Sequence, residues 1–134
     1  MGLRVNGICF DCAHPASLAR FWAAALGYRV RPYLDEDLEA LRATGIEDVE
    51  DDPTVAVDGP NGEPTLWFNE VPEGKVVKNR VHLDLMPDTS MEAETERLLS
   101  LGATVVRAYE DGGAPWTVMR DPEGNELCVQ SPRR

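Results

Sequence analysis

The feature of this sequence that most constrains its fold is an internal repeat. The segments GICFDCAHPASLARFWAAALG (residues 7–27) and HLDLMPDTSMEAETERLLSLG (residues 82–102) align without gaps at an offset of 75 residues. Each begins with alternating apolar and polar residues, passes a proline-containing turn, shows apolar residues at helical spacing, and ends in Leu-Gly. Alternation indicates a strand and spacing of three to four residues indicates a helix. We therefore expect a strand, a turn and a helix in each half.

Three strand-like runs follow each of these helices. They are Tyr28–Pro32, Thr54–Val57 and Thr65–Val71 in the first half, and Ala103–Tyr109, Trp116–Arg120 and Glu126–Ser131 in the second. The repeat predicts the α+β class, with two pseudo-symmetric βαβββ modules at residues 1–72 and 79–134 and a linker at 73–78. A chain of 134 residues suits a single domain, 1–134. Two sheets facing each other would form a sheet-lined cleft.

Charge and cysteine content exclude several classes of partner. The net charge of −11 argues against binding to nucleic acid and to anionic membranes, both of which need basic surface. Between residues 35 and 52 there are nine acidic residues and only one basic residue, Arg42. Leucines in the same segment indicate a short helix. This acidic segment is either a solvated face or a rim that attracts cationic ligands.

Three cysteines without a framework spacing, and no long apolar segment, predict a cytoplasmic protein. Cys9 and Cys12 should lie on opposite faces of their strand.

Three stretches of the chain resemble a known superfamily. They are FDCAHPASLARFWAAALGYRV (10–30), KNRVHLDLMPD (78–88) and VMRDPEGNELCVQ (118–130). Together they are similar to the glyoxalase/bleomycin-resistance/dioxygenase (vicinal oxygen chelate) proteins, and most of all to the small glyoxalase-like members. The resemblance implies the glyoxalase/bleomycin resistance/dihydroxybiphenyl dioxygenase-like fold, a homodimer, and a small-molecule site in the cavity. The superfamily includes lyases, isomerases, dioxygenases, thiol transferases acting on epoxide antibiotics, and drug-sequestering proteins, so fold alone does not identify the function.

The resemblance also implies where a catalytic metal would bind, with one ligand on the first and one on the last strand of each half. His82 matches the first-strand ligand of the second half, but its counterpart at the offset of 75 is Gly7, which has no side chain. Cys128 stands where the family has a glutamate, and the last strand of the first half offers Trp67 and Asn69 on one face. We therefore expect no metal cofactor. If a divalent metal is bound, we expect His82, Glu126 and Cys128 to hold it.

The expected function is metal-independent binding of a small molecule, with sequestration of a cationic or planar aromatic compound and a role in antibiotic resistance. The alternative is a glyoxalase-like lyase, isomerase or dioxygenase that uses His82 as the catalytic residue, with a non-standard metal site or as an acid or base. The competing interpretation of His82 is a hydrogen bond within the sheet, and that of Trp67 and Trp116 is core packing. The candidate ligand-binding residues are Cys9, Asp11, Trp67, Asn69, His82, Asp84, Trp116, Glu126, Cys128 and Gln130.

Overall fold

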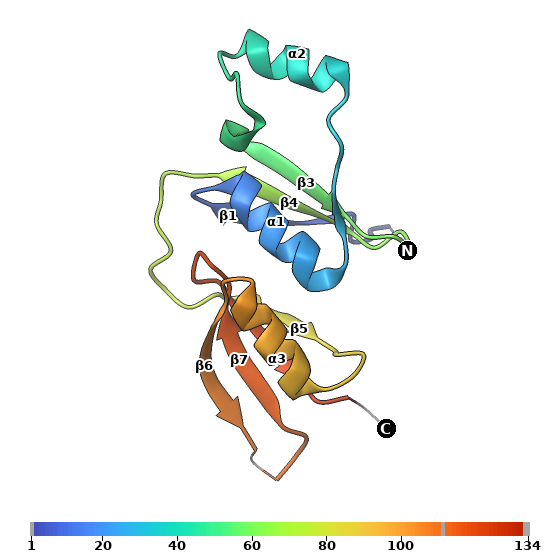
Figure 1. The fold of residues 1–134 in the computed structure, drawn as a ribbon, viewed down its shortest axis with the longest axis vertical. Coiled ribbons are helices and arrows are strands. Elements are labelled where there is room, and N and C mark those ends of the chain that lie inside the picture. The colour runs from blue at the N-terminus through green and yellow to red at the C-terminus, as the bar shows by residue number, and fades with distance from the viewer. Residues whose placement is uncertain (1, 111, 133–134) are drawn as a thin grey trace. The chain divides into compact units, whose positions relative to one another are not determined.

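The computed structural model describes residues 2–110 and 112–132. The chain divides into two compact units, residues 1–74 and 75–134 (Figure 1). Each contains a four-stranded sheet with a helix packed against it, so the α+β class and the repeated βαβββ plan are confirmed. That the two units make a single domain around a shared cleft stays a prediction.

The first unit holds β1 (Gly7–Cys12), α1 (Pro15–Leu26), β2 (Arg29–Val30), α2 (Asp35–Ala43), a 3-10 helix η1 (Val49–Asp51), β3 (Thr54–Asp58) and β4 (Thr65–Glu70). The second holds β5 (Leu83–Leu85), α3 (Met91–Ser100), β6 (Thr104–Tyr109), β7 (Trp116–Arg120) and β8 (Glu126–Gln130). The strand orders are β1-β4-β3-β2 and β5-β8-β7-β6, and in each sheet the first pair is parallel and the others antiparallel. The two sheets therefore share one topology, as the repeat predicts.

Local signals explain where the two long helices begin and end. Pro15 occupies the first turn of α1, where its missing N–H is not needed, and Gly27 ends the helix in the left-handed region at φ 68°. At α3, the Ser90 side chain accepts a hydrogen bond from the backbone N–H of Ala93 at 3.0 Å. These residues explain why α1 begins at Pro15 and α3 at Met91, each after the first strand of its module.

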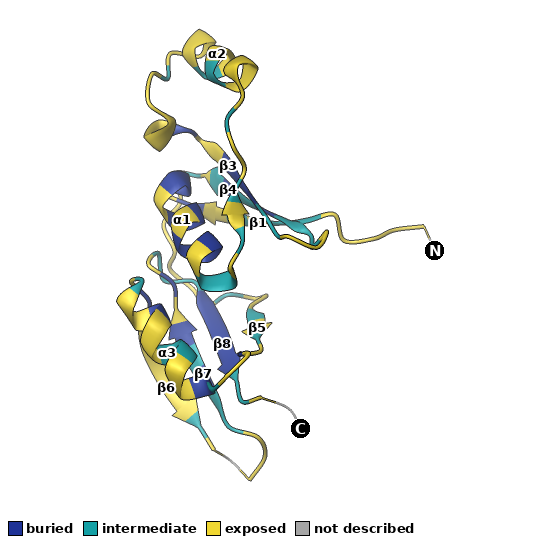
Figure 2. Ribbon diagram, turned by 45° about the vertical axis from the view of Figure 1, so that its right-hand side comes forward, coloured by how far each residue is buried: buried dark blue, intermediate teal, exposed yellow. Residues whose placement is uncertain are grey.

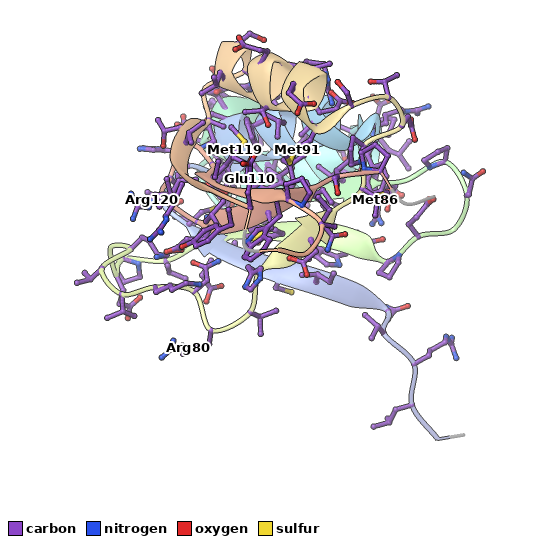
Figure 3. All side chains as sticks on the ribbon, turned by 90° about the horizontal axis from the view of Figure 1, so that it is seen from below. Arg80, Met86, Met91, Glu110, Met119 and Arg120 are labelled. Atoms are coloured by element: carbon purple, nitrogen blue, oxygen red, sulfur yellow. The ribbon has the colours of Figure 1, made fainter. Side chains whose placement is uncertain are left out.

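Each helix covers one face of its own sheet and leaves the other face open (Figure 2). In the first unit Leu18 and Trp22 pack on the buried face with Val57 and Phe68, and Phe10 stacks against Phe68 at 5.0 Å between ring centroids. In the second unit, Met119 and Met91 lie between α3 and its sheet, whereas Arg80 is exposed (Figure 3). The burial pattern of each strand therefore tells which side chains belong to the open face.

The helix expected within the acidic segment is α2, and it differs from α1 and α3 in its packing. None of its residues is buried, and extended connections join it to the rest of the first unit (Figure 1). Its first turn carries Asp35, Glu36 and Asp37, which complement the positive end of the helix dipole. None of the helices within residues 2–110 and 112–132 has the length and apolar character needed to cross a membrane.

Candidate functional site

The candidate site residues lie on the open faces of the two sheets, and strand register relates the two faces. Asp84 on β5 pairs with Cys128 on β8, and at the same place in the first sheet Cys9 on β1 pairs with Trp67 on β4. Because Cys9 precedes Asp84 by the repeat offset, Trp67 is the structural counterpart of Cys128. The register of β4, which was open at the level of sequence, thus places an indole where the second module has a thiol.

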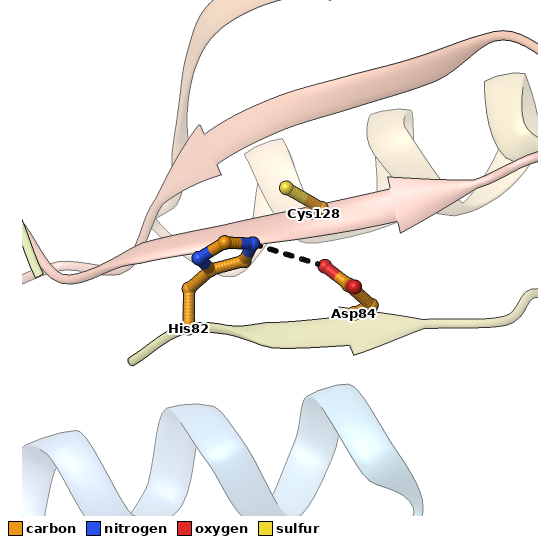
Figure 4. Close-up of side chains that lie close together, drawn as sticks. All are labelled: His82, Asp84 and Cys128. Atoms are coloured by element: carbon orange, nitrogen blue, oxygen red, sulfur yellow. Dashed lines mark ion pairs between the residues drawn. The ribbon is translucent and has the colours of Figure 1, made fainter. Parts of the chain in front are cut away.

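Three side chains of the second module converge on the open face of its sheet (Figure 4). Nε2 of His82 lies 3.2 Å from Oδ1 of Asp84, and one potential metal-ligating atom from each of His82, Asp84 and Cys128 lies within 4.8 Å of the other two. His82 and Asp84 are exposed, whereas Cys128 is buried. His82 immediately precedes β5 and contacts Asp84, two residues further along the chain. The parallel pairing of β5 with β8 brings Cys128 beside Asp84.

Burial and charge keep the Cys128 thiol protonated. Burial raises its pKa first, and the negative charge of Asp84 together with a hydrogen bond to that carboxylate raises the pKa further, against a smaller opposing effect of Lys78. A thiolate beside a carboxylate is disfavoured by like-charge repulsion. The protonated thiol is therefore a hydrogen-bond donor rather than a nucleophile.

Glu126 shares the open face but has different partners. Its Oε1 lies 3.2 Å from Nζ of Lys75, and its Oε2 accepts a hydrogen bond from the backbone N–H of Asn79 at 3.3 Å. Burial would raise the pKa of Glu126, but the hydrogen bonds from Asn79 and Lys75 outweigh it and lower the pKa. The structure thus brings Asp84, and not Glu126, to the metal-ligating atoms of His82 and Cys128.

In the first module the equivalent space is filled by an aromatic ring. A Cβ atom on Gly7 would lie 3.1 Å from Cδ1 of Trp67, and the guanidinium of Arg31 lies 5.0 Å from the centre of the same indole. Cys9 and Asp11 are exposed on this face, whereas Cys12 is buried on the other, as the alternation of β1 predicts. Arg31 was missed at the level of sequence, where the short run before the acidic segment carries no motif.

Trp116 and Gln130 border a cavity of about 800 Å³ that continues the open face of the second sheet beyond Asp84 and Cys128. The rings of Trp116 and Tyr109 are stacked with centroids 4.7 Å apart and planes 6° from parallel, and Arg107 lies 4.7 Å over Tyr109. Trp116 is half-buried and lines the cavity, so it is not a core residue. The stacked partner Tyr109 was not recognised as a site residue from the sequence.

The side chains fit the family's metal only in part. An imidazole, a thiol and a carboxylate at this spacing suit a borderline ion such as Zn²⁺, which takes three protein ligands in catalytic sites. At the two matching positions of the first module, Gly7 offers no donor and Trp67 offers an indole, which is not a ligand. An ion held by both modules through the family's four positions therefore does not fit these residues.

Comparison with known proteins agrees with this fold. The sequence pattern of the family described as Glyoxalase-like domain matches residues 7–130, and the chain belongs to this family. It is similar in structure to a glyoxalase/bleomycin resistance protein/dioxygenase family enzyme from Burkholderia phytofirmans PsJN, with a TM-score of 0.68, 16% identity, and coverage of 96% of this chain and 98% of that one.

Two further solved structures share the fold. The fosfomycin resistance protein FosX from Mesorhizobium loti has a TM-score of 0.67 at 10% identity, covering 99% of this chain and 95% of that one. The hypothetical protein SA1046 from S. aureus has a TM-score of 0.65 at 15% identity, covering 98% and 99%. The comparison with curated proteins gave no match. The superfamily resemblance seen in the sequence is thus confirmed.

Proposed function

We propose that this protein is a metal-independent small-molecule-binding protein of the glyoxalase-like type, which sequesters a planar aromatic or cationic compound. We further propose that it acts in the cytoplasm as a homodimer and contributes to resistance against such a compound. The observation that supports binding without metal is the contact between Gly7 and Trp67: the first module has an indole where the family has metal ligands.

The open faces provide the surfaces that such a ligand needs. Trp67 and Trp116 are both half-buried, so each exposes part of a flat aromatic surface. The cavity beside Trp116 has a volume of about 800 Å³, in the range of ligand pockets, and Gln130 adds a hydrogen-bonding amide. Asp11 and Asp84 add negative charge to these faces, which favours a cationic ligand.

Titration with a planar aromatic cation, acriflavine, tests this proposal. We expect saturable binding that is the same with and without a chelator, together with shifts of the indole N–H signals of Trp67 or Trp116. The variant Trp116→Ala should weaken binding, whereas the control Val76→Ala, at a side chain that is 90% exposed, should leave it unchanged. Loss of binding on chelation, or no saturable binding by acriflavine, would overturn the proposal.

The group of His82, Asp84 and Cys128 favours a second candidate function, that of a glyoxalase-like enzyme. In this reaction class His82 would take up or release a proton, while Asp84 holds the ring at 3.2 Å and balances its charge. A Zn²⁺ ion bound by the three side chains would supply Lewis-acid chemistry.

Metal analysis of protein purified without chelator separates the two candidates. Near-stoichiometric zinc that is lost in Cys128→Ser but retained in the exposed-thiol control Cys9→Ser would favour the enzyme. Co²⁺ would then give a thiolate charge-transfer band in the unchanged protein and in Cys9→Ser, but not in Cys128→Ser. If the protein turns over a substrate without metal, and His82→Ala abolishes this turnover while substrate affinity is kept, the result would favour a metal-free enzyme.

A further inference from the structure

A second cavity lies within the first unit, between α2 and the open face of β3 and β4. Its volume is about 430 Å³. Trp67 and Ala56 line it from the sheet, Leu41 and Asp37 line it from α2, and Tyr33 and Asp52 line it from the segments that connect α2 to the sheet. The acidic segment therefore builds one wall of an open pocket over this face of the sheet.

Two carboxylates in this wall form no salt bridge with any described residue. Asp52 is 8% exposed, and its two oxygens accept hydrogen bonds from the hydroxyl of Tyr33 at 2.6 Å and from the backbone N–H of Thr54 at 3.0 Å. Asp37 accepts a hydrogen bond from the backbone N–H of Leu34 at 2.8 Å. All three donors are neutral. Within residues 2–110 and 112–132, no ion pair involves Asp37 or Asp52.

The cation that lines this cavity is already neutralised. Arg31 donates two hydrogen bonds to Asp58, at 2.8 and 2.9 Å, and its guanidinium lies over the indole of Trp67. Asp58 is therefore the hydrogen-bonded counter-charge of Arg31, and Asp37 adds a weaker electrostatic attraction to the same guanidinium. The carboxylates of Asp37 and Asp52 still outnumber the cationic groups of the lining. The Arg31 contact also demonstrates that this indole face accepts a cation.

The raised pKa of Tyr33 is consistent with the same negative potential. Burial raises the pKa of its phenol first, and the hydrogen bond and charge of Asp52, with the charges of Asp37 and Glu50, raise it further. Glu50 is paired with Arg20 through two hydrogen bonds, so it contributes less to the uncompensated charge than the two aspartates.

We propose that this cavity binds a small organic cation, with its ammonium group at Asp37 and Asp52 and its apolar body against Trp67 and Leu41. The apolar part of the lining favours an organic cation over a bare metal ion, since a metal ion would leave that surface unused. The carboxylates exclude an anion. Because none of its residues is buried, α2 can move aside at little cost to admit the ligand. This inference deepens the proposed function, because it names the charge of the ligand and the place of its cationic group.

Titration with benzyltrimethylammonium tests the inference, with N-benzylacetamide as a neutral probe and phenylacetate as an anionic probe of similar size. Backbone and indole N–H signals in the ¹H–¹⁵N correlation spectrum locate the binding. We expect the cation to shift the Trp67 indole signal and backbone signals of residues 33–44. The two other probes should bind more weakly or not at all.

Matched variants test which carboxylates act. Asp37→Asn can still accept the hydrogen bond from Leu34, and it should weaken binding of the cation about threefold. Glu39→Gln removes the same charge from an exposed side chain of the same helix that does not line the cavity, and it should leave affinity unchanged. Trp67→Leu should weaken binding about tenfold through loss of the aromatic contact with the phenyl ring of the probe.

Equal affinity for the cation and the neutral probe, or equal effects of Asp37→Asn and Glu39→Gln, would overturn the inference. Shifts confined to residues around His82 and Trp116 would overturn it while leaving the proposed function standing. Binding at residues 33–44 that survives Trp116→Ala supports the inference even if acriflavine binding fails, and absence of any binding by all probes overturns both.

Discussion

The indole of Trp67 occupies the space that a side chain at residue 7 would need, since a Cβ atom on Gly7 would lie 3.1 Å from Cδ1 and 3.2 Å from Nε1 of that ring. In the second module the corresponding pair is His82 with Cys128, a large side chain immediately before the first strand and a small one on the last. The two modules thus fill the same part of the sheet face from opposite strands. One arrangement offers metal-ligating atoms and the other offers an aromatic surface.

Gly7→Ala is expected to displace the Trp67 ring. The added methyl group meets both the indole and the backbone oxygen of Thr65 at 3.1 Å, so the neighbours must shift. Overpacking costs about 1–3 kcal/mol, and the lost flexibility of the unfolded chain offsets about 0.4–1 kcal/mol of that. We expect a net loss of unfolding free energy of about 1 kcal/mol in urea titrations, with a shifted Trp67 indole N–H signal.

Gly74→Ala is the matched control for this substitution. A Cβ atom at Gly74 has no heavy atom within 4 Å and the backbone there is not left-handed, so the added methyl should cause no loss of stability. Equal stability of the two variants, with an unchanged Trp67 signal in Gly7→Ala, would show that the contact does not constrain residue 7.

Asp84→Asn is expected to lower the pKa of the Cys128 thiol, because the carboxylate charge that opposes ionisation is removed while burial remains. The rate of alkylation of Cys128 by iodoacetamide, followed by mass spectrometry across pH, should shift to lower pH. Asp88→Asn, at an exposed acid of the same unit, is the control. An unchanged profile in Asp84→Asn would contradict the coupling.

The same raised pKa predicts a loss of stability at alkaline pH. The native state favours the protonated thiol, so this contribution is fully present below the ordinary thiol pKa, about 8.5, and is lost as the pH rises through the native value. Cys128→Ser removes the titrating group, and its unfolding free energy should decline less between pH 8 and pH 10 than that of the unchanged protein.

Glu126→Gln is expected to destabilise the second unit, since a buried carboxylate that accepts from Asn79 and pairs with Lys75 loses its charge. Hydrogen bonds to charged groups contribute about 1.5–3 kcal/mol, and we expect a loss of about 1–2 kcal/mol at pH 7. The lowered pKa of Glu126 means that this stability is present above the unfolded-state pKa, about 4.3, and is lost as the pH falls through the native value.

Urea unfolding at pH 7 and at pH 3 measures this effect. The difference between Glu126→Gln and the unchanged protein should shrink at the lower pH, whereas the exposed control Glu96→Gln should match the unchanged protein at both. A difference that is independent of pH would mean that the carboxylate charge is not responsible.

The repeat allowed the fold to be predicted because each module contains its own local signals: alternation in the strands, Pro15 and Ser90 at helix starts, and Gly27 after α1. The composition of the site was only partly predictable. His82 and Asp84 are two residues apart, so an extended chain brings them to one face in any register. Whether Asp84 or Glu126 joins His82 and Cys128 depends on how β8 aligns with β5. The pairing of Tyr33 with Asp52 depends on the path of the acidic segment, which carries no pairing signal in the sequence.

Asp52→Asn is expected to lower the pKa of Tyr33. Burial raises that pKa and persists in the variant, but the hydrogen bond to a charged acceptor and the repulsion of the phenolate by Asp52 are removed. Absorbance at 295 nm during alkaline titration, taken as the difference from the same protein carrying Tyr33→Phe, isolates this residue from Tyr28 and Tyr109. The exposed neighbour substitution Asp51→Asn should leave the Tyr33 titration unchanged.

The raised pKa also fixes the sign of a stability effect. Protonated Tyr33 stabilises the first unit below the ordinary phenol pKa, about 10, and this contribution is lost as the pH rises through the higher native value. Benzyltrimethylammonium bound beside Asp52 would counter the carboxylate charge and so lower the Tyr33 pKa. If a saturating concentration of the cation leaves the pKa of Tyr33 unchanged, the bound ammonium group lies away from Asp52.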